Sequence, residues 1–278
     1  MAEDFELFSS LRYDKALLQV AGSDLTHAGW NWANRSPLYM LDFHRDRILR
    51  AATHWGWDAA IDILSGEAGL KRLEEFILSS LGENISSPMR VRVSITKLGQ
   101  LKIVTGPVSQ TPLENLFPEV LPPPEGIKTD KTSTNMPVKS PEYMVMVDQM
   151  GSARSEYTHF KTSKRAVYDG ARQRAQIGLL DLKEVLIVSE TTGDIMEGSV
   201  TTPYFWRDGR WVTPAVSKEY SAEKGSGGQD GTSRRWALKR GMAVEATIPA
   251  SSLVEGEECW LSNGVRGFIF GRVTLRSP

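Results

Sequence analysis

The sequence predicts an α/β protein of the α+β kind with two lobes: a smaller N-terminal α/β lobe and a strand-rich, barrel-like C-terminal lobe. Helical and strand-like periodicities are mixed in the first part of the chain, whereas strand-like runs dominate the last part. Between them, eight of the 14 prolines fall from Pro107 to Pro141. Proline lacks an amide donor and cannot continue a helix or a central strand. We therefore expect lobes at 1–110 and 141–278, joined by a proline-rich connection at 111–140.

The elements of the first lobe follow from apolar spacing. FELFSSLRY and MRVRVSIT alternate as strands do, and Leu98-Gly99-Gln100 returns the second of them as a hairpin. Two longer segments repeat apolar residues at helical intervals. The elements expected are strands at 5–13, 89–96 and 101–106, and helices at 40–57 and 69–82.

The second lobe contains many short apolar runs separated by turn signals such as Asp208-Gly209, a pattern typical of a curved or barrel-like sheet. Helical spacing is present in two places, and the chain before Lys161 is interpreted as a strand, with Ser163 capping the helix that follows. The elements expected are strands at 142–148, 184–190, 194–200, 204–212, 243–248, 257–263 and 266–273, and helices at 163–176 and 232–240.

Composition argues against several kinds of partner. The formal net charge is −1, so no overall field attracts nucleic acid or an anionic membrane. The sequence has no run of the ~20 apolar residues that a membrane helix needs, and its N-terminus, MAEDFELFSS, lacks an apolar signal core. Cys259 is the single cysteine, so no intrachain disulfide is possible. We expect a cytoplasmic protein without nucleic-acid or membrane partners.

Metal and common hydrolase chemistry are also disfavoured. The four histidines are scattered and there is one cysteine, so no metal site is expected, and no G-x-S-x-G motif is present. The run GSGGQDGTSRR at 225–235 fits neither the nucleotide P-loop nor the dinucleotide fingerprint. It is either a flexible surface loop or a phosphate cup of another kind. The second reading is supported by Gly231-Thr232-Ser233, which leads directly into a helix.

Five segments in order resemble one family. A lysine near the middle of the chain is followed by a glutamate in MEGSV and then by the glycine-rich run, as in fold-type IV pyridoxal-phosphate enzymes, which include aminotransferases and aminodeoxychorismate lyases. The chain looks most similar to the fungal-type aminodeoxychorismate lyase group. The segments are LFSSLRYD, FKTSKRAVYDGARQRA, MEGSVTTPYFWRDGRWVTP, GTSRRWALKRG and WLSNGVRGFIFGRV.

The resemblance implies pyridoxal 5′-phosphate as cofactor and assigns two residues to its reactive ring. Lys161 matches the lysine that forms the Schiff base. A solvated lysine has a pKa of about 10.4, so this chemistry needs desolvation or a cationic neighbour. Glu197 matches the carboxylate that pairs with the pyridine nitrogen and makes the ring an electron sink.

The resemblance also implies a set of phosphate ligands. Arg47 matches the family's phosphate-binding arginine, with Arg45 and Arg50 as close alternatives. The first phosphate cup and a second loop of backbone amides match four further residues: Thr232, Ser233, Asn263 and Gly264.

The substrate side is less defined. Ser10 and Arg12 lie in the family's active-site strand, and Lys97 falls where related lyases place a cation for a substrate carboxylate. Arg266 is another cation near the phosphate loop. The hydroxyl that protonates the leaving enol remains open among Ser10, Thr201 and Thr202.

The function implied by the resemblance is conversion of 4-amino-4-deoxychorismate to 4-aminobenzoate and pyruvate on the way to folate. Lys161 would act as the base. An aminotransferase of the same fold, acting on D-amino acids, branched-chain amino acids or (R)-amines, is the alternative, because both reactions begin with the same proton abstraction. A cofactor-binding protein without catalysis is a third interpretation. The resemblance further implies a homodimer.

Overall fold

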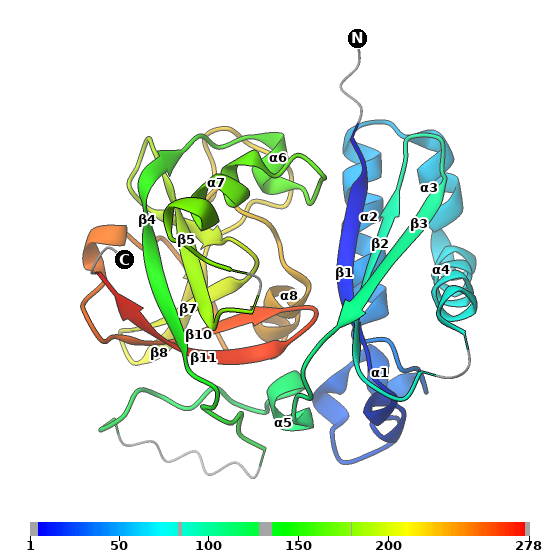
Figure 1. The fold of residues 1–278 in the computed structure, drawn as a ribbon, viewed down its shortest axis with the longest axis horizontal. Helices are drawn as coiled ribbons and strands as arrows, with labels where there is room; N and C mark the ends of the chain where they lie inside the picture. The colour runs from blue at the N-terminus through cyan, green and yellow to red at the C-terminus, as the bar shows by residue number, and fades with distance from the viewer. Residues whose placement is uncertain (1–4, 83–84, 128–134, 179, 276–278) are drawn as a thin grey trace. The chain divides into compact units, whose positions relative to one another are not determined.

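A computed structural model describes residues 5–82, 85–127, 135–178 and 180–275. Residues 128–134 of the proline-rich connection and 1–4 of the acidic N-terminus lie outside this part. The chain divides into two compact units, coloured along the sequence in Figure 1. Unit 1 comprises Met1–Leu113, Phe160–Lys164 and Gly264–Arg266, and unit 2 comprises Glu114–His159, Arg165–Asn263 and Gly267–Pro278.

Unit 1 contains a three-stranded antiparallel sheet in the order β1-β2-β3. Leu7 pairs with Ile95 and Leu11 with Val91, so the apolar positions of β1 and β2 coincide on one face. Gly99 forms the hairpin turn with a φ of +77°, a conformation that a side chain disfavours. All three expected strands are confirmed: β1 (Leu7–Tyr13), β2 (Met89–Ile95) and β3 (Leu101–Pro107).

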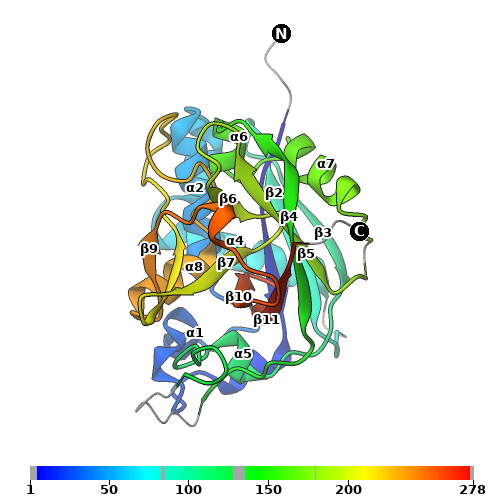
Figure 2. The same ribbon diagram turned by 90° about the vertical axis from the view of Figure 1, so that its left-hand side faces the viewer.

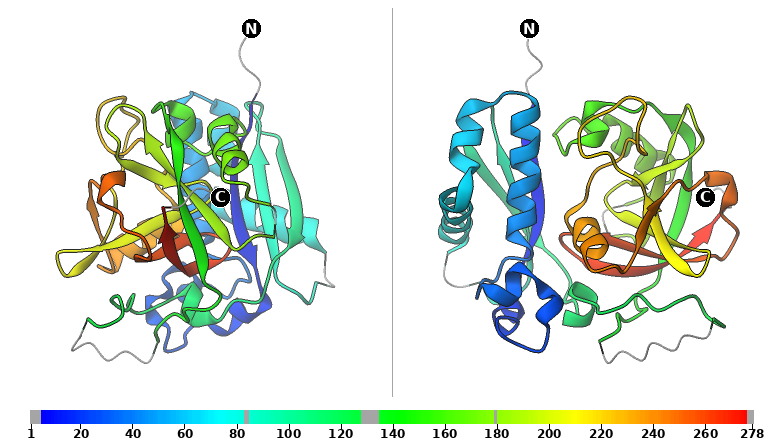
Figure 3. Two further views of the ribbon diagram at one scale, coloured as in Figure 1. Left: turned by 60° about the vertical axis from the view of Figure 1, so that its left-hand side comes forward. Right: turned by 180° about the vertical axis from the view of Figure 1, so that it is seen from behind.

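Helices cover the apolar face of this sheet, as the right-hand view of Figure 3 shows for unit 1. The core joins Leu7 and Leu11 of the sheet to Ile48 and Leu73 of the helices. The two helices expected from apolar spacing are confirmed as α2 and α4, and further short helices were not anticipated. The helices are η1 (Lys15–Gln19), η2 (Thr26–Ala28), α1 (Trp30–Ala33), α2 (Leu41–His54), α3 (Asp58–Leu64) and α4 (Gly66–Leu81).

Unit 2 is built on an eight-stranded sheet in the order β6-β5-β4-β11-β10-β7-β8-β9. The sheet is curled, so that β6 returns toward β7 and β8 (Figure 2). Its interior is apolar, with Val145, Phe205 and Leu261 fully buried. The expectation of a curved, barrel-like sheet is confirmed. The strands are β4 (Tyr143–Ser152), β5 (Lys183–Ser189), β6 (Ile195–Gly198), β7 (Thr202–Arg207), β8 (Arg210–Pro214), β9 (Val244–Ala246), β10 (Glu258–Asn263) and β11 (Gly267–Thr274).

Helix α7 packs against β4 and β5 (Figure 2), and α8 packs against β10. The helices of the second part are α5 (Leu113–Leu116), α6 (Glu156–His159), α7 (Ala166–Arg174), α8 (Thr232–Lys239) and the 3-10 turn η3 (Ala250–Ser252). Throughout the described part of the chain, no helix combines the length and the apolar character that crossing a bilayer requires.

Two local expectations were wrong. The residues before Lys161 form the short helix α6, and not a strand. Helix α7 begins at Ala166, and not at Ser163. Ser163 does not cap the helix because its hydroxyl accepts a hydrogen bond from the Glu6 amide at 3.0 Å.

Candidate active site

The segment that contains Lys161 is fixed to the outer edge of β1, the edge that β2 does not use. The Phe8 amide donates to the Lys161 carbonyl at 3.2 Å, and the Arg12 amide donates to the Gly264 carbonyl at 3.0 Å. Strand residues rise by about 3.3 Å each, so these attachment points lie roughly 13 Å apart along β1. Ser10 lies between them. One strand therefore orders both the lysine segment and the start of the 264–266 loop.

Two cations share one aromatic ring in unit 1. The Lys161 Nζ lies 5.1 Å from the centroid of the Phe8 ring, and the Arg92 guanidinium carbon lies 3.9 Å from the same centroid. A ring face attracts cations, while two positive charges close to one another repel. Lys161 thus shares the Phe8 ring with a second cation, Arg92.

The side chain of Arg47 in α2 is oriented by hydrogen bonds among neighbouring polar side chains. Its guanidinium donates to the Ser9 hydroxyl, and that hydroxyl lies 2.6 Å from Nδ1 of His44. A guanidinium can only donate, so Ser9 accepts from Arg47. The Ser9 proton is then available to Nδ1 of a neutral His44. Among the three arginines considered, Arg45 is held instead by Asp46 and by the Leu64 and Gly66 carbonyls.

Arg12 is buried, and its N–H groups donate hydrogen bonds to other groups of the protein. It is 0% exposed, forms an ion pair with Asp14 at 2.8 Å, and donates to the Ser109 carbonyl at 3.1 Å. It also donates to the Val265 carbonyl at 3.4 Å, which ties the 264–266 loop to β1. This geometry gives Arg12 a positioning role for that loop.

Glu197 lies on the short strand β6 and is 8% exposed. The phenol of Tyr168 donates to its Oε1 at 2.6 Å, and the backbone amide of Gln229 donates to the same oxygen at 3.2 Å. Burial, and next the adjacent carboxylate, raise the pKa of Tyr168 well above its ordinary value. The phenol therefore remains a donor, and the carboxylate is held by two hydrogen bonds inside unit 2.

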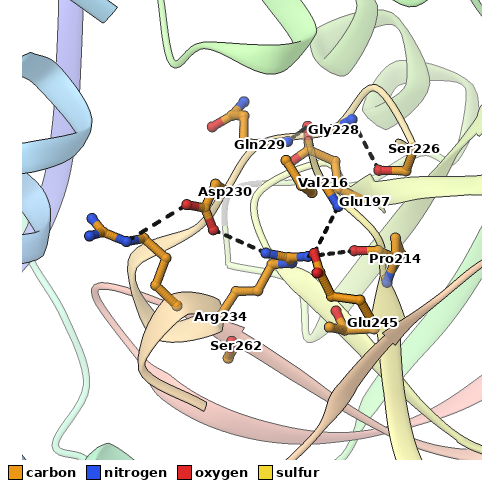
Figure 4. Close-up of polar contacts among 12 residues, drawn as sticks. Glu197, Pro214, Val216, Ser226, Gly228, Gln229, Asp230, Arg234, Glu245 and Ser262 are labelled. Atoms are coloured by element: carbon orange, nitrogen blue, oxygen red, sulfur yellow. Dashed lines mark hydrogen bonds and ion pairs between the residues drawn. The ribbon is translucent and has the colours of Figure 1, made fainter. Parts of the chain in front are cut away.

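The glycine-rich run is a buried and pinned loop, which excludes the flexible-loop interpretation. The Ser226 amide donates to the Ala215 carbonyl at 2.6 Å, and its hydroxyl donates to the Met196 carbonyl at 3.2 Å. A side chain at Gly228 would collide with the Met196 carbonyl, so glycine is required where the loop passes β6. Figure 4 shows this loop with Glu197 and Gln229.

Arg234 anchors the far end of the loop. It is 3% exposed and donates to Asp230 at 3.0 Å, to the Pro214 carbonyl at 2.8 Å, and to Glu245 (Figure 4). Two carboxylates offset its charge, as a buried guanidinium requires. These contacts fix the start of α8.

The start of α8 fits a phosphate. The helix is preceded by Gly231, which has no side chain to cap the first amides. The Thr232 hydroxyl is buried without a hydrogen-bond partner in the structure. An orphaned buried hydroxyl beside uncapped amides at the positive end of a helix suits a dianion. The residues present therefore fit a phosphate group.

A chain of hydroxyls extends this site. The Ser233 hydroxyl lies 2.8 Å from that of Ser262, which lies 2.9 Å from the phenol oxygen of Tyr204. Ser262 directly precedes Asn263 at the end of β10. Ser233 thus lies beside Ser262, the residue before Asn263, within unit 2, while Arg47, Lys161 and Gly264 belong to unit 1.

The remaining polar residues differ in their surroundings. Thr201 donates its hydroxyl proton to the buried Glu184 at 2.8 Å, whereas Thr202 pairs with Ser262 across β7 and β10. Lys97 is exposed at the hairpin turn. In the described residues, no group of three or more His, Cys, Asp or Glu side chains is arranged to hold a metal ion.

Sequence reasoning missed three residues around the assigned ones: Arg92, Tyr168 and Gln229. The alternation of MRVRVSIT places Arg92 on the face of β2 opposite the core, which was a usable signal. Tyr168 and Gln229 contact Glu197 from a helix and from a loop. No local sequence pattern connects Tyr168 and Gln229 with Glu197.

Comparison with known proteins defines the class. A model of the amino-transferase class IV family matches residues 29–272. The aminodeoxychorismate lyase of Saccharomyces cerevisiae is 29% identical over 232 residues, which is 77% of this chain and 59% of the yeast protein. The match thus spans about three fifths of the length of that relative.

Solved structures agree in fold. A proposed amino-acid aminotransferase from Mesorhizobium loti is 20% identical, with a TM-score of 0.62 over 98% of this chain and 100% of that one. A proposed 4-amino-4-deoxychorismate lyase from Haemophilus somnus is 15% identical, with a TM-score of 0.55 over 95% and 97%. At these identities the likeness shows the fold, which is that of fold-type IV enzymes.

The chain belongs to the class IV aminotransferase family. The expectation of a pyridoxal-phosphate-dependent enzyme, either a lyase or an aminotransferase, is thereby confirmed.

Proposed function

We propose that this protein is a 4-amino-4-deoxychorismate lyase that produces 4-aminobenzoate and pyruvate. The observation that carries the proposal is the 29% identity to a lyase of that name over 77% of the chain. The ordered segments around Lys161, Glu197 and Thr232 support it.

Pyridoxal 5′-phosphate fits the residues present. Thr232 and Ser233 would bind the phosphate through the first turn of α8, where the Thr232 hydroxyl is unpartnered. Arg47, Asn263 and Gly264 are proposed as further phosphate ligands. Glu197 is the proposed partner of the ring nitrogen, and Lys161 the residue that links covalently to the cofactor.

The chain's own residues then have defined tasks. When bound, the cofactor supplies an aldehyde that takes up the substrate amine and a ring that withdraws electrons. Lys161 would be the base that removes the proton from the amine-bearing carbon of the substrate. Glu197 holds the ring nitrogen protonated by offering a fixed negative charge. Loss of the enolpyruvyl group makes the substrate ring aromatic, and no second substrate is needed.

Arg92 is the cation that we assign to a substrate carboxylate. It is half-buried and shares the Phe8 ring with Lys161, the residue that acts on the substrate. Lys97 is exposed, and Arg12 is fully buried in an ion pair with Asp14. A guanidinium also matches a carboxylate with two parallel donors. Ser10, on the same face of β1 as Phe8, and Thr202 are retained as hydroxyls for the leaving enol. Thr201 donates to Glu184.

An aminotransferase acting on D-amino acids, branched-chain amino acids or (R)-amines is the second candidate, because the solved relatives include an aminotransferase of the same fold. The deciding assay mixes the purified, cofactor-loaded protein with enzymatically prepared aminodeoxychorismate and follows 4-aminobenzoate fluorescence. Turnover without added amino donor or keto acid supports the lyase. Amine transfer from an amino acid to pyruvate, with no fluorescence, contradicts it.

The proposal extends to assembly and location: a homodimer that acts in the cytoplasm on a small-molecule substrate. Light scattering of the purified protein at micromolar concentration tests the first part. A mass of 30.9 kDa, that of a single chain, would contradict the dimer.

A further inference from the structure

One phenol links three parts of unit 2 around Glu197. The Tyr168 oxygen lies 2.6 Å from Oε1 of Glu197 on β6 and 3.1 Å from the carbonyl of Thr158 in α6. Nε2 of Gln229 donates to the same oxygen at 3.0 Å. Tyr168, Thr158 and Gln229 are all buried. Helix α6, helix α7, strand β6 and the glycine-rich loop therefore meet at this phenol.

The direction of each hydrogen bond can be assigned. Gln229 offers an amide N–H, so the phenol oxygen accepts from it. The single phenol proton has two acceptors within reach, a carboxylate at 2.6 Å and a carbonyl at 3.1 Å. The shorter bond to an ionised group is the stronger one, so the proton lies toward Glu197. A chain of donors thus runs from Gln229 through Tyr168 to Oε1.

Oε1 receives a second donor from the backbone of the same loop. The Gln229 amide lies 3.2 Å from it, and the loop approaches β6 because residue 228 is a glycine. Two donors on one carboxylate oxygen favour the charged form over the protonated one. They also fix the rotation of the carboxylate about its terminal bond, which is otherwise broad.

We propose that Tyr168 and Gln229 are positioning residues: they bind Oε1 of Glu197, keep the carboxylate charged and turn Oε2 toward the protonated ring nitrogen. This inference rests on the proposed function, since it assigns Glu197 to that nitrogen. Tyr168 would act through Glu197.

The test uses pyridoxal phosphate labelled with ¹⁵N in the ring, bound to the purified full-length protein. The ¹⁵N chemical shift reports whether the ring nitrogen is protonated, and equilibrium dialysis gives the cofactor dissociation constant. The variants are Tyr168→Phe, Gln229→Met and Glu197→Gln. Tyr143→Phe is the matched control, because Tyr143 is a buried tyrosine of β4 in a separate apolar cluster.

Tyr168→Phe should shift the ¹⁵N signal toward the unprotonated value and raise the dissociation constant about tenfold, the effect of one hydrogen bond to a charged group. Gln229→Met keeps the backbone amide that binds Glu197. It should change the ¹⁵N chemical shift and the dissociation constant in the same direction as Tyr168→Phe, but by less. Tyr143→Phe should match the wild type.

A wild-type signal in both Tyr168→Phe and Gln229→Met, with a changed signal in Glu197→Gln, overturns the positioning role while the proposed function stands. A wild-type signal in Glu197→Gln refutes the assignment of Glu197 itself, and the positioning role with it. If Tyr168→Phe fails to fold, Gln229→Met decides: an unchanged signal overturns the proposal.

Discussion

Arg12 and Asp14 form an ion pair inside unit 1, with 2.8 Å between guanidinium and carboxylate and side-chain exposures of 0% and 7%. Asp14 also accepts from the Ala16 amide at 3.0 Å, and Arg12 reaches the Ser109 and Val265 carbonyls. The pair therefore joins the end of β1 to the connection that leaves β3 and to the 264–266 loop.

Replacing Arg12 with methionine should destabilise the protein by about 3–5 kcal/mol, because it leaves the Asp14 charge buried without its partner. Urea unfolding followed by circular dichroism measures the loss. Arg90→Met, on an exposed position of β2, should stay within about 0.5 kcal/mol of the wild type. A raised KM at unchanged stability would instead make Arg12 a substrate ligand.

Lys161→Ala should abolish the visible absorbance of the cofactor-loaded protein and its turnover, since no other amine replaces the covalent link. Borohydride reduction followed by peptide mass mapping locates the attachment in the wild type. Lys164→Ala should keep both colour and turnover. Retained colour in Lys161→Ala would refute the assignment of the lysine.

Thr232→Val should weaken pyridoxal phosphate about tenfold and leave pyridoxal binding unchanged, because only the former carries a phosphate. The apo-protein should be as stable as the wild type or more so, since the lost hydroxyl is buried without a partner. Thr232→Ser keeps the hydroxyl and should retain most of the affinity. An equal loss of affinity for pyridoxal phosphate and for pyridoxal would contradict phosphate binding at the start of α8.

Arg92→Met should raise KM for aminodeoxychorismate roughly 10- to 100-fold, the effect of losing a hydrogen bond between charged groups. Lys97→Met should change KM less than twofold because Lys97 is exposed at a turn. Steady-state fluorescence assays measure both. The opposite ranking would restore the sequence-based assignment of Lys97.

Tyr168 should not ionise in the native protein near pH 10. Burial, and next the Glu197 charge, raise its folded pKa, whereas an unfolded tyrosine titrates at about 10. Its contribution to stability is thus complete below pH ~10 and is lost as the pH rises above it. Tyr168→Phe should leave the native phenolate absorbance step unchanged and lower the step in urea by one of the seven tyrosines. A smaller native step would contradict the raised pKa.

The sequence was sufficient to predict a helix or strand where the burial of one face determines the spacing of its apolar residues. β2 alternates because one face is core, and α4 repeats Leu73 and Ile77 because one stripe packs on the sheet. It was insufficient where a distant partner decides. Ser163 looked like a cap, and its hydroxyl instead binds the amide of Glu6, 157 positions away.

The candidate site shows the same division. Motifs were enough to propose chemical roles for Lys161 and Glu197, whereas the residues around them could not be predicted. The burial of a cationic side chain depends on tertiary packing. The sequence alone therefore could not decide between Arg12 and Lys97 as substrate-binding residues. Tyr168 has the spacing of an ordinary core residue on α7, and only the structure places its phenol on Glu197.

The outer edge of β1 has a consequence for synthesis on the ribosome. Its partners are translated much later: Val265, which accepts from Arg12, follows it by 253 positions. A nascent N-terminal fragment therefore presents an open strand edge, a template for unwanted pairing, until translation has passed Val265. The unit that is started first is thus completed only after most of the second unit has been translated. A chaperone that shields this edge during translation would improve the yield of native protein.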